Sequence, residues 1–181
     1  MITYIALLRG INVGGNKIIK MQDLKLMFQS LGFHNVRTYI QSGNVLFESN
    51  EVSEHQLREL LERQLKETFG FEVSVILRTL AEVEQVIINH PFVLSEPDDY
   101  KRWYVSFLPA EPSSEAMDKL RMYEDGPDKL RLVGREMYIL YDVSVSHSAL
   151  SKVSFDKILG MPVTARNWNT VNKLIALGRT E

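Results

Sequence analysis

The order of apolar and polar segments is the feature that most constrains the fold of this chain. The first half reads strand, helix, strand, strand, helix, strand. This βαββαβ order predicts a ferredoxin-like unit, whose sheet has the strand order 4-1-3-2 with antiparallel neighbours. The predicted strands are residues 2–9, 36–41, 45–49 and 71–78, and the predicted helices are 21–31 and the stretch between Ser53 and Gly70.

Local patterns support these segments. Leu24, Met27, Phe28 and Leu31 recur at the spacing of one helix face. Residues 2–9 are apolar on both alternating faces, which is typical of a central strand that is covered on both sides. Ser53 and Gln56 have the spacing of a capping box, which predicts a helix start at this point.

The second half repeats the order less cleanly. Strands are predicted at 102–108, 130–133, 137–141 and 162–164, and helices at 113–123, 149–159 and 167–177. A helix from 79 to about 89 and a loop at 93–100 separate the halves. The sequence therefore predicts an α+β protein of two ferredoxin-like (βαββαβ, α-β plait) subdomains with additional helices. The first subdomain is 1–78, the helix and linker are 79–100, and the second subdomain with a C-terminal helix is 101–181.

Composition excludes several function classes. The chain has no cysteine, so disulfides, thiolate catalysis and cysteine-based metal sites are excluded. Its four histidines are dispersed without metal-ligand spacing, and we predict neither a metal nor a cofactor. No apolar stretch approaches the roughly 20 residues that span a bilayer. The N-terminus lacks the basic region of a signal peptide, so no membrane association and a cytoplasmic location are expected.

Nucleic acid is an unlikely partner for two reasons. The formal net charge is −2, whereas proteins that bind phosphate backbones usually carry a basic excess. RNA-recognition motifs share the βαββαβ order but need exposed aromatic residues on the first and third strands. Here those strands offer Tyr4 and Phe47 without the basic-glycine-aromatic pattern that the motif requires.

Topology predicts which loops are neighbours. In a βαββαβ unit the loop that leaves the first strand and the hairpin between the second and third strands lie at the same end of the sheet. Here these are residues 9–17 and 41–44, the most polar and glycine-bearing stretches of the first half. We therefore expect them to share one rim.

The first candidate segment, residues 9–17, follows a strand and precedes a helix. Glycine amides there could approach a ligand, and cationic side chains could bind an anion. The spacing matches neither a dinucleotide fingerprint nor a P-loop. The alternative is a glycine-bearing turn with a salt-bridged arginine. The candidate binding residues are Arg9, Asn12, Gly14, Gly15 and Lys17.

The second segment contributes Gln41, Ser42 and Asn44, whose side chains could orient a ligand held by Arg9. The alternative is ordinary hairpin-turn chemistry at Gly43 and Asn44. Ser42 is a weak candidate nucleophile, because no histidine is evidently paired with it.

The third segment contributes Arg166, Asn167 and Trp168 at the start of the last predicted helix. Asn167 is a good N-cap, and an arginine at this place could hold an anion. The alternative is a helix cap beside a tryptophan that packs in the core or at a domain interface.

These three segments carry a family resemblance. ALLRGINVGG (6–15), TYIQSGNV (38–45) and TARNWNTVNKL (164–174) resemble the bacterial domain-of-unknown-function family 1697, over essentially the whole chain. The resemblance implies two ferredoxin-like subdomains and supplies no activity. It implies a shared site from the family's signature residues, which are Arg9, Asn12, Gly14, Gly15, Gln41, Ser42, Gly43, Asn44, Arg166, Asn167 and Trp168.

Three hypotheses of function follow. The first is a binding module for a small anionic ligand (a phosphate, carboxylate or nucleotide), with Arg9 and Arg166 holding the charge. The second is an enzyme that uses the same pocket, although no convincing base or nucleophile is evident. The third is a protein-interaction or assembly module, in which the polar signatures fix turns. The sequence does not predict an oligomeric state.

Overall fold

The chain forms two compact units of mixed α and β structure. They are described in a computed structural model that covers residues 1–93 and 97–180, with residues 97–99 described by their backbone alone. Unit 1 contains Met1–Glu84 and Leu174–Glu181, and unit 2 contains Gln85–Lys173. Each unit has one four-stranded antiparallel sheet, and helices α3 (Leu80–Ile88) and α6 (Trp168–Gly178) contribute residues to both units. The predicted subdomain boundaries stay a prediction.

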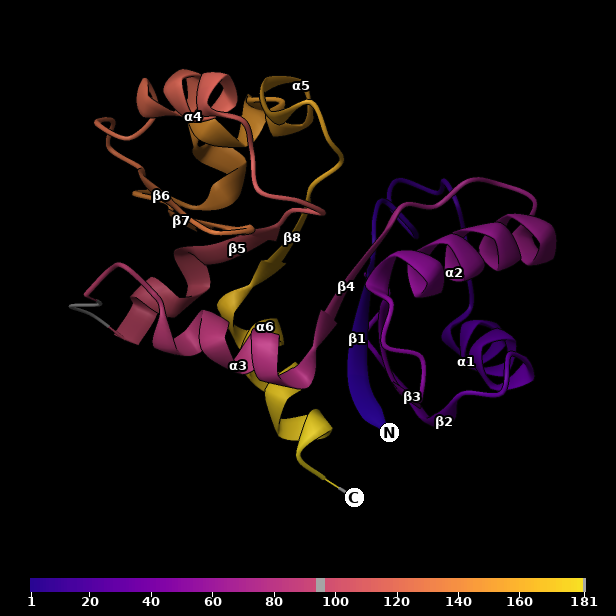
Figure 1. The fold of residues 1–181 in the computed structure, drawn as a ribbon. Coiled ribbons are helices and arrows are strands. Elements are labelled where there is room, and N and C mark those ends of the chain that lie inside the picture. Colours follow the sequence, from indigo (N-terminus) through magenta and orange to yellow (C-terminus); the bar gives the residue numbers. More distant parts are fainter. Residues whose placement is uncertain (94–96, 181) are drawn as a thin grey trace. The chain divides into compact units, whose positions relative to one another are not determined.

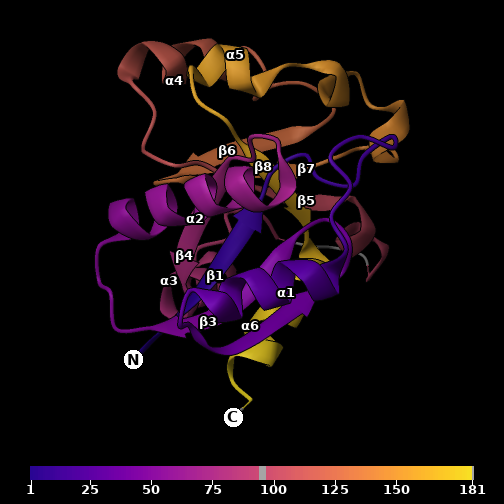
Figure 2. The same cartoon turned by 90° about the vertical axis from the view of Figure 1, so that its right-hand side faces the viewer.

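The sheet of unit 1 has the strand order that the sequence predicted. Its order is β2-β3-β1-β4, and every neighbouring pair is antiparallel. Helices α1 and α2 lie against one face of this sheet (Figures 1 and 2). The elements are β1 (Ile2–Leu8), α1 (Met21–Ser30), β2 (His34–Tyr39), β3 (Asn44–Ser49), α2 (Glu54–Phe69) and β4 (Val75–Thr79).

Both faces of the central strand β1 are buried, as its apolar pattern predicted. Tyr4, Ala6 and Leu8 belong to the core that includes buried residues of α1 and α2, and Ile5 and Leu7 on the opposite face have 0% exposure.

The first- and third-strand aromatics lie inside this core. The rings of Tyr4 and Phe47 stack with their centroids 5.6 Å apart, and both side chains are buried. They are therefore not presented to solvent as a platform for nucleic acid bases.

Capping boxes form to different extents at the starts of α2 and α3. Thr79 and Glu82 form a complete capping box at α3, with Thr79 N donating to Glu82 Oε2 (2.7 Å) and Glu82 N donating to Thr79 Oγ1 (3.2 Å). At α2, Ser53 Oγ accepts from Gln56 N at 3.3 Å. The reciprocal bond predicted from Gln56 is replaced, because the Ser53 amide donates to the nearer carboxylate of Glu51 at 2.8 Å.

Unit 2 has the sheet order β6-β7-β5-β8, again with antiparallel neighbours. Helices α4 and α5 cover one face of this sheet (Figures 1 and 2). Burial raises the pKa of Tyr141 in the core to about 12 and that of Tyr138 well above its ordinary value. The strands are β5 (Trp103–Phe107), β6 (Lys129–Val133), β7 (Glu136–Leu140) and β8 (Thr164–Asn167), the helices are α4 (Ser114–Arg121) and α5 (Phe155–Leu159), and the 3-10 turns are Pro97–Arg102, Val145–His147 and Ala149–Lys152.

Unit 2 differs from the prediction in two places. The helix predicted at 149–159 is a 3-10 turn followed by the short α5, because Val153 and Ser154 between them have extended backbone angles. The strand predicted at 162–164 is β8, which begins at Thr164 and places Arg166 in the sheet. Residues 94–96 of the predicted linker lie outside the described residues. Within the described part of the chain, none of the helices has the length and apolar character needed to cross a bilayer.

Arg37 of β2 fastens the C-terminal end of α6 to unit 1. Its Nη1 donates to the backbone oxygens of Leu177 and Thr180 and to Thr180 Oγ1, the last at 2.8 Å. Carbonyls in the last turn of a helix have no partner within the helix, so a guanidinium that binds Leu177 O and also Thr180, just beyond the helix, stabilises this end.

We expect Arg37→Leu to lower the free energy of unfolding by about 1.5–3 kcal/mol, because hydrogen bonds from a charged donor are lost. Amide hydrogen exchange at residues 177–180 should accelerate, and urea unfolding gives the overall change. The control is Arg179→Leu, which removes an exposed pair with Glu84 at 2.7 Å. It should cost less than about 1 kcal/mol. Equal losses in the two variants would contradict the role of Arg37.

Candidate functional site

Gly14 and Gly15 of the first segment form the tip of a small hairpin. Asn12 N donates to Lys17 O at 3.1 Å, and Asn16 N donates to Val13 O at 3.0 Å. Gly14 and Gly15 have φ of 57° and 76°, the combination that a type I′ turn requires. Because α1 begins at Met21, this turn and the helix N-terminus are separate features.

Asn12 joins the two predicted segments. Its Nδ2 donates to the backbone oxygen of Gln41 at 2.8 Å and to that of Ile19 at 3.0 Å, and its Oδ1 accepts from Ile19 N at 2.8 Å. Leu8 N also donates to Gly43 O at 2.9 Å. The loop after β1 and the bend between β2 and β3 therefore share one end of the sheet.

The second segment is bonded largely to itself. Asn44 is fully buried, and its Nδ2 donates to Tyr39 O (2.8 Å) and Ser42 Oγ (3.1 Å). Ile40 has φ of 49°, which is unusual for a β-branched residue, and it is 46% exposed. Of this segment, Gln41 presents an exposed side chain, whereas Asn44 stabilises the bend.

A polar cleft of about 750 Å³ lies beside the first segment in unit 1. Arg9 and Lys17 line it, together with side chains of α2 and the backbone that leads into β4. Lys17 Nζ donates to Glu72 O at 2.7 Å, and Arg9 N donates to Ser74 O at 3.0 Å, so both cationic residues are anchored at this wall. The full lining is Arg9, Lys17, Glu59, Glu62, Arg63, Lys66, Glu72, Val73 and Ser74.

The charges in this cleft favour an anion. Four of its lining side chains are cationic and three are carboxylates. Each carboxylate has a partner within the protein: Glu62 Oε1 accepts from Val75 N at 2.9 Å, Glu72 lies 3.2 Å from Lys66, and Glu59 lies 3.5 Å from His55 Nδ1. The engaged carboxylates compete less for the remaining cations, which leaves Lys17 and Arg63 best placed to contact an anionic ligand.

Arg63 and Lys66 line this cleft but are not among the candidate residues predicted from the sequence. The predicted topology could have indicated these residues, because α2 leads into β4, and β4 pairs with β1. The polar edge of α2 must then run beside the loop that leaves β1. Asn12, Gly14, Gly15, Gln41, Ser42 and Asn44 are not among the described residues that line the cleft.

The third segment belongs to unit 2. Arg166 is 6% exposed, and its Nη1 donates to Thr164 Oγ1 (2.8 Å) and Ala165 O (2.9 Å). Burial lowers the pKa of Arg166 to about 10, which leaves the side chain cationic at neutral pH.

Its two neighbours have structural contacts. Asn167 is the predicted N-cap of α6, since its Oδ1 accepts from Thr170 N at 2.8 Å. The ring of Trp168 stacks on that of Trp103 with a centroid distance of 3.9 Å and an interplanar angle of 7°.

The described residues contain no group of three or more His, Cys, Asp or Glu side chains arranged to hold a metal ion. The cleft in unit 1 has no histidine among its described lining residues. Its chemistry is that of guanidinium, ammonium and carboxylate groups.

Comparisons with known proteins identify a family and a solved structure of similar fold. The family model described as "Protein of unknown function (DUF1697)" matches residues 1–138. The solved structure of conserved bacterial protein SP0830 from Streptococcus pneumoniae is similar, with a TM-score of 0.77 and 27% sequence identity over 98% of this chain and 99% of that chain. No curated protein matches the chain.

Gly43 lies where the bend between β2 and β3 comes close to the end of β1 and the loop that follows it. Its φ is 86°, and an added Cβ would lie 2.9 Å from Leu8 Cβ, which is fixed on β1, and 2.7 Å from Ile11 Cδ1. We expect Gly43→Ala to lower the free energy of unfolding by about 2–4 kcal/mol in urea titrations, through backbone strain and overpacking together.

Gly70→Ala is the matched control for this prediction. Gly70 has φ of 84°, but nothing lies within 4 Å of an added Cβ. The free energy of unfolding of the Gly70→Ala variant should fall by only about 1–2 kcal/mol, which is the cost of the left-handed conformation alone. A loss as large as that of Gly43→Ala would show that steric contact between the segments adds nothing.

Proposed function

The chain belongs to the DUF1697 family of unknown function, and because that family assigns no activity, we propose from its own residues that it is a binding module for a small anionic ligand. The observation that supports this proposal is the cleft of unit 1, in which Arg9 and Lys17 lie with Arg63 and Lys66. A phosphate, a carboxylate or a nucleotide phosphate fits this chemistry, since guanidinium and ammonium groups form strong charge-assisted hydrogen bonds to such anions.

The hairpin of residues 12–17 supports the proposal indirectly. Lys17 is held at the cleft by its backbone bond to Asn12 and by its ammonium bond to Glu72 O. Asn12 in turn is bonded to the bend at Gln41. Among the signature residues of unit 1, Arg9 then lines the cleft, whereas Asn12 fixes the loop that carries Lys17. Such preorganisation favours affinity, because less freedom is lost on binding.

We also propose a ferredoxin-like topology for each unit. The sheet orders β2-β3-β1-β4 and β6-β7-β5-β8, both with antiparallel neighbours, support it. The absence of cysteine from the sequence supports a cytoplasmic location, where thiols are kept reduced and disulfides are rare.

A second candidate is the protein-interaction module. Apolar side chains on the same loops favour it, since Val13 is 64%, Ile18 65% and Ile40 46% exposed. Isolated exposed apolar residues are common on protein surfaces, so this observation carries less weight than the charged cleft.

The binding proposal is tested by amide chemical-shift titration with inorganic phosphate, pyrophosphate and citrate, with glycerol as a neutral probe. Shifts should concentrate at residues 9–17, 59–66 and 72–74. The double variant Lys17→Gln/Arg63→Gln should weaken binding of the best anion by roughly tenfold, because charge-assisted contacts are lost.

The control is Lys152→Gln/Arg121→Gln, which changes the net charge equally at two exposed positions outside the cleft. It should leave the affinity within about twofold, since exposed distant charges are screened. Equal weakening by both variants, or no shift of the unmodified protein at millimolar anion, would overturn the proposal.

A further inference from the structure

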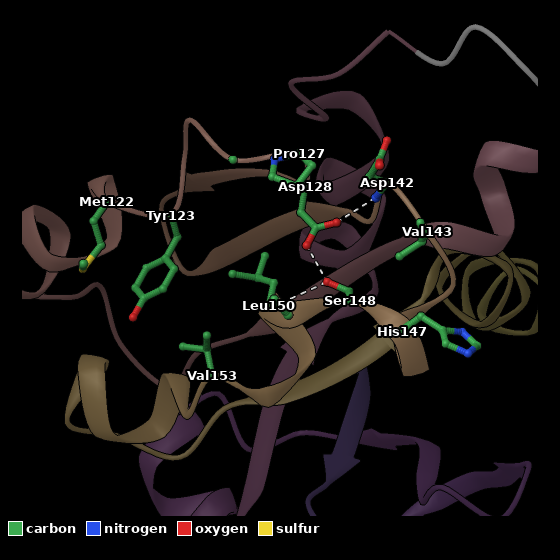
Figure 3. Close-up of a pocket in the computed structure, with 12 residues that line it drawn as sticks. Met122, Tyr123, Pro127, Asp128, Asp142, Val143, His147, Ser148, Leu150 and Val153 are labelled. Atoms are coloured by element: carbon green, nitrogen blue, oxygen red, sulfur yellow. Dashed lines mark hydrogen bonds between the residues drawn. The ribbon is translucent and has the colours of Figure 1, made fainter.

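Unit 2 contains a second cavity with different chemistry, of about 360 Å³ (Figure 3). Its walls come from the end of α4, the turn before β6 and the segment that follows β7. Apolar side chains such as Leu150, Val153 and Val143 form much of this surface, and Tyr123 adds an aromatic ring. Its volume is that of a site for a small organic molecule.

The cavity contains a buried carboxylate. Asp128 is 6% exposed; its Oδ1 accepts from Asp142 N at 2.7 Å, and its Oδ2 accepts from Ser148 Oγ. Figure 3 shows the carboxylate between these two donors, above Leu150. No lysine or arginine of the described residues forms a hydrogen bond or ion pair with it. An ionised carboxylate accepts about four hydrogen bonds, so two donors leave capacity for another.

This arrangement is not a catalytic triad, although Asp128, His147 and Ser148 all line the cavity. The hydroxyl of Ser148 donates directly to Asp128 and accepts from Leu150 N at 3.1 Å. His147 Nδ1 instead contacts Ser144 Oγ at 2.6 Å, and its ring points away from Asp128 in Figure 3. Among the described contacts, Ser148, the serine that lines the cavity, therefore has no histidine base in hydrogen-bond contact.

We propose that this cavity is a binding site for a small organic amine, whose ammonium group pairs with Asp128 and whose apolar body lies against Leu150, Val153 and Tyr123. A buried charge without an ionic partner is costly, and an ammonium ligand offsets that cost. The exposed carboxylate of Asp142, another lining residue, adds negative potential for a cation that enters. The site is independent of the anion cleft, since no lining residue is shared.

The experiment compares three probes of similar shape and different charge: 2-phenylethylamine, 2-phenylethanol and phenylacetate. Amide shifts of the full chain are followed during each titration at neutral pH. The amine should bind in the millimolar range, with shifts at residues 122–128 and 142–153. The neutral alcohol should bind roughly tenfold more weakly, because the charge-assisted bond is missing. Phenylacetate should be weakest, because its carboxylate is repelled.

Two variants separate a ligand role of Asp128 from a structural one. Asp128→Asn keeps an acceptor for Asp142 N, and its amide can donate to Ser148 Oγ, so the local bonds survive while the charge is lost. It should bind the amine and the alcohol equally. Val153→Phe leaves Asp128 unchanged and fills the cavity, so it should abolish binding of all three probes. The amide spectrum of each variant shows whether it is folded.

Several outcomes would overturn the proposal. These are equal affinity of the unmodified protein for the three probes, no binding of the amine, shifts located elsewhere on the chain, or unchanged amine binding in either folded variant. If Asp128→Asn does not fold, Asp142→Asn takes its place. A weaker preference for the amine over the alcohol would then support the site, and an unchanged preference would count against it.

Discussion

The side chain of Asn12 is the contact on which the structure of the loops beside the cleft of unit 1 depends. One amide group satisfies the backbone of Ile19 in both directions and also reaches the carbonyl of Gln41. It therefore fixes the path of the loop after β1 against a bend that follows it by about 30 residues. Lys17 is at the far side of the hairpin that Asn12 begins, so the position of a cleft cation is set by a residue outside the cleft. Gly43 makes this close approach possible, because any side chain there would overlap Leu8.

Predictions of structure from the sequence were most accurate where a physical requirement allows few conformations. A strand with both faces apolar must be covered on both sides, and β1 is. Two glycines in succession in a loop suit a turn with positive φ, and Gly14 and Gly15 form one. The apolar spacing gave a wrong prediction where local hydrogen bonds decide the backbone conformation. Residues 149–159 have a helical spacing of apolar side chains, yet Ser148 caps a separate 3-10 turn, and the chain is extended at Val153 and Ser154.

The candidate site was only partly predictable for a different reason. Binding and structure use the same residue types, so a motif does not say which role a residue has. Asn44 and Gln41 belong to one bend, but Asn44 is buried and bonded to Tyr39 and Ser42, whereas Gln41 is exposed. Arg9 and Arg166 look equivalent in sequence, yet one lines an open cleft and the other is buried in β8. Arg63 was not predicted as a site residue, because it is the fold that places it at the cleft beside the loop after β1.

The net charge of the whole chain does not indicate which ligands its individual cavities favour. The formal value of −2 is an average over surfaces of opposite character. One cavity gathers four cationic side chains and three carboxylates, and each carboxylate has a partner within the protein. The other has apolar walls around a buried carboxylate that no described cation neutralises. A ligand responds to the charges within about a Debye length of it, roughly 8 Å at physiological salt. Discrimination between anions and cations is therefore decided cavity by cavity, and a nearly neutral chain can carry a site for each.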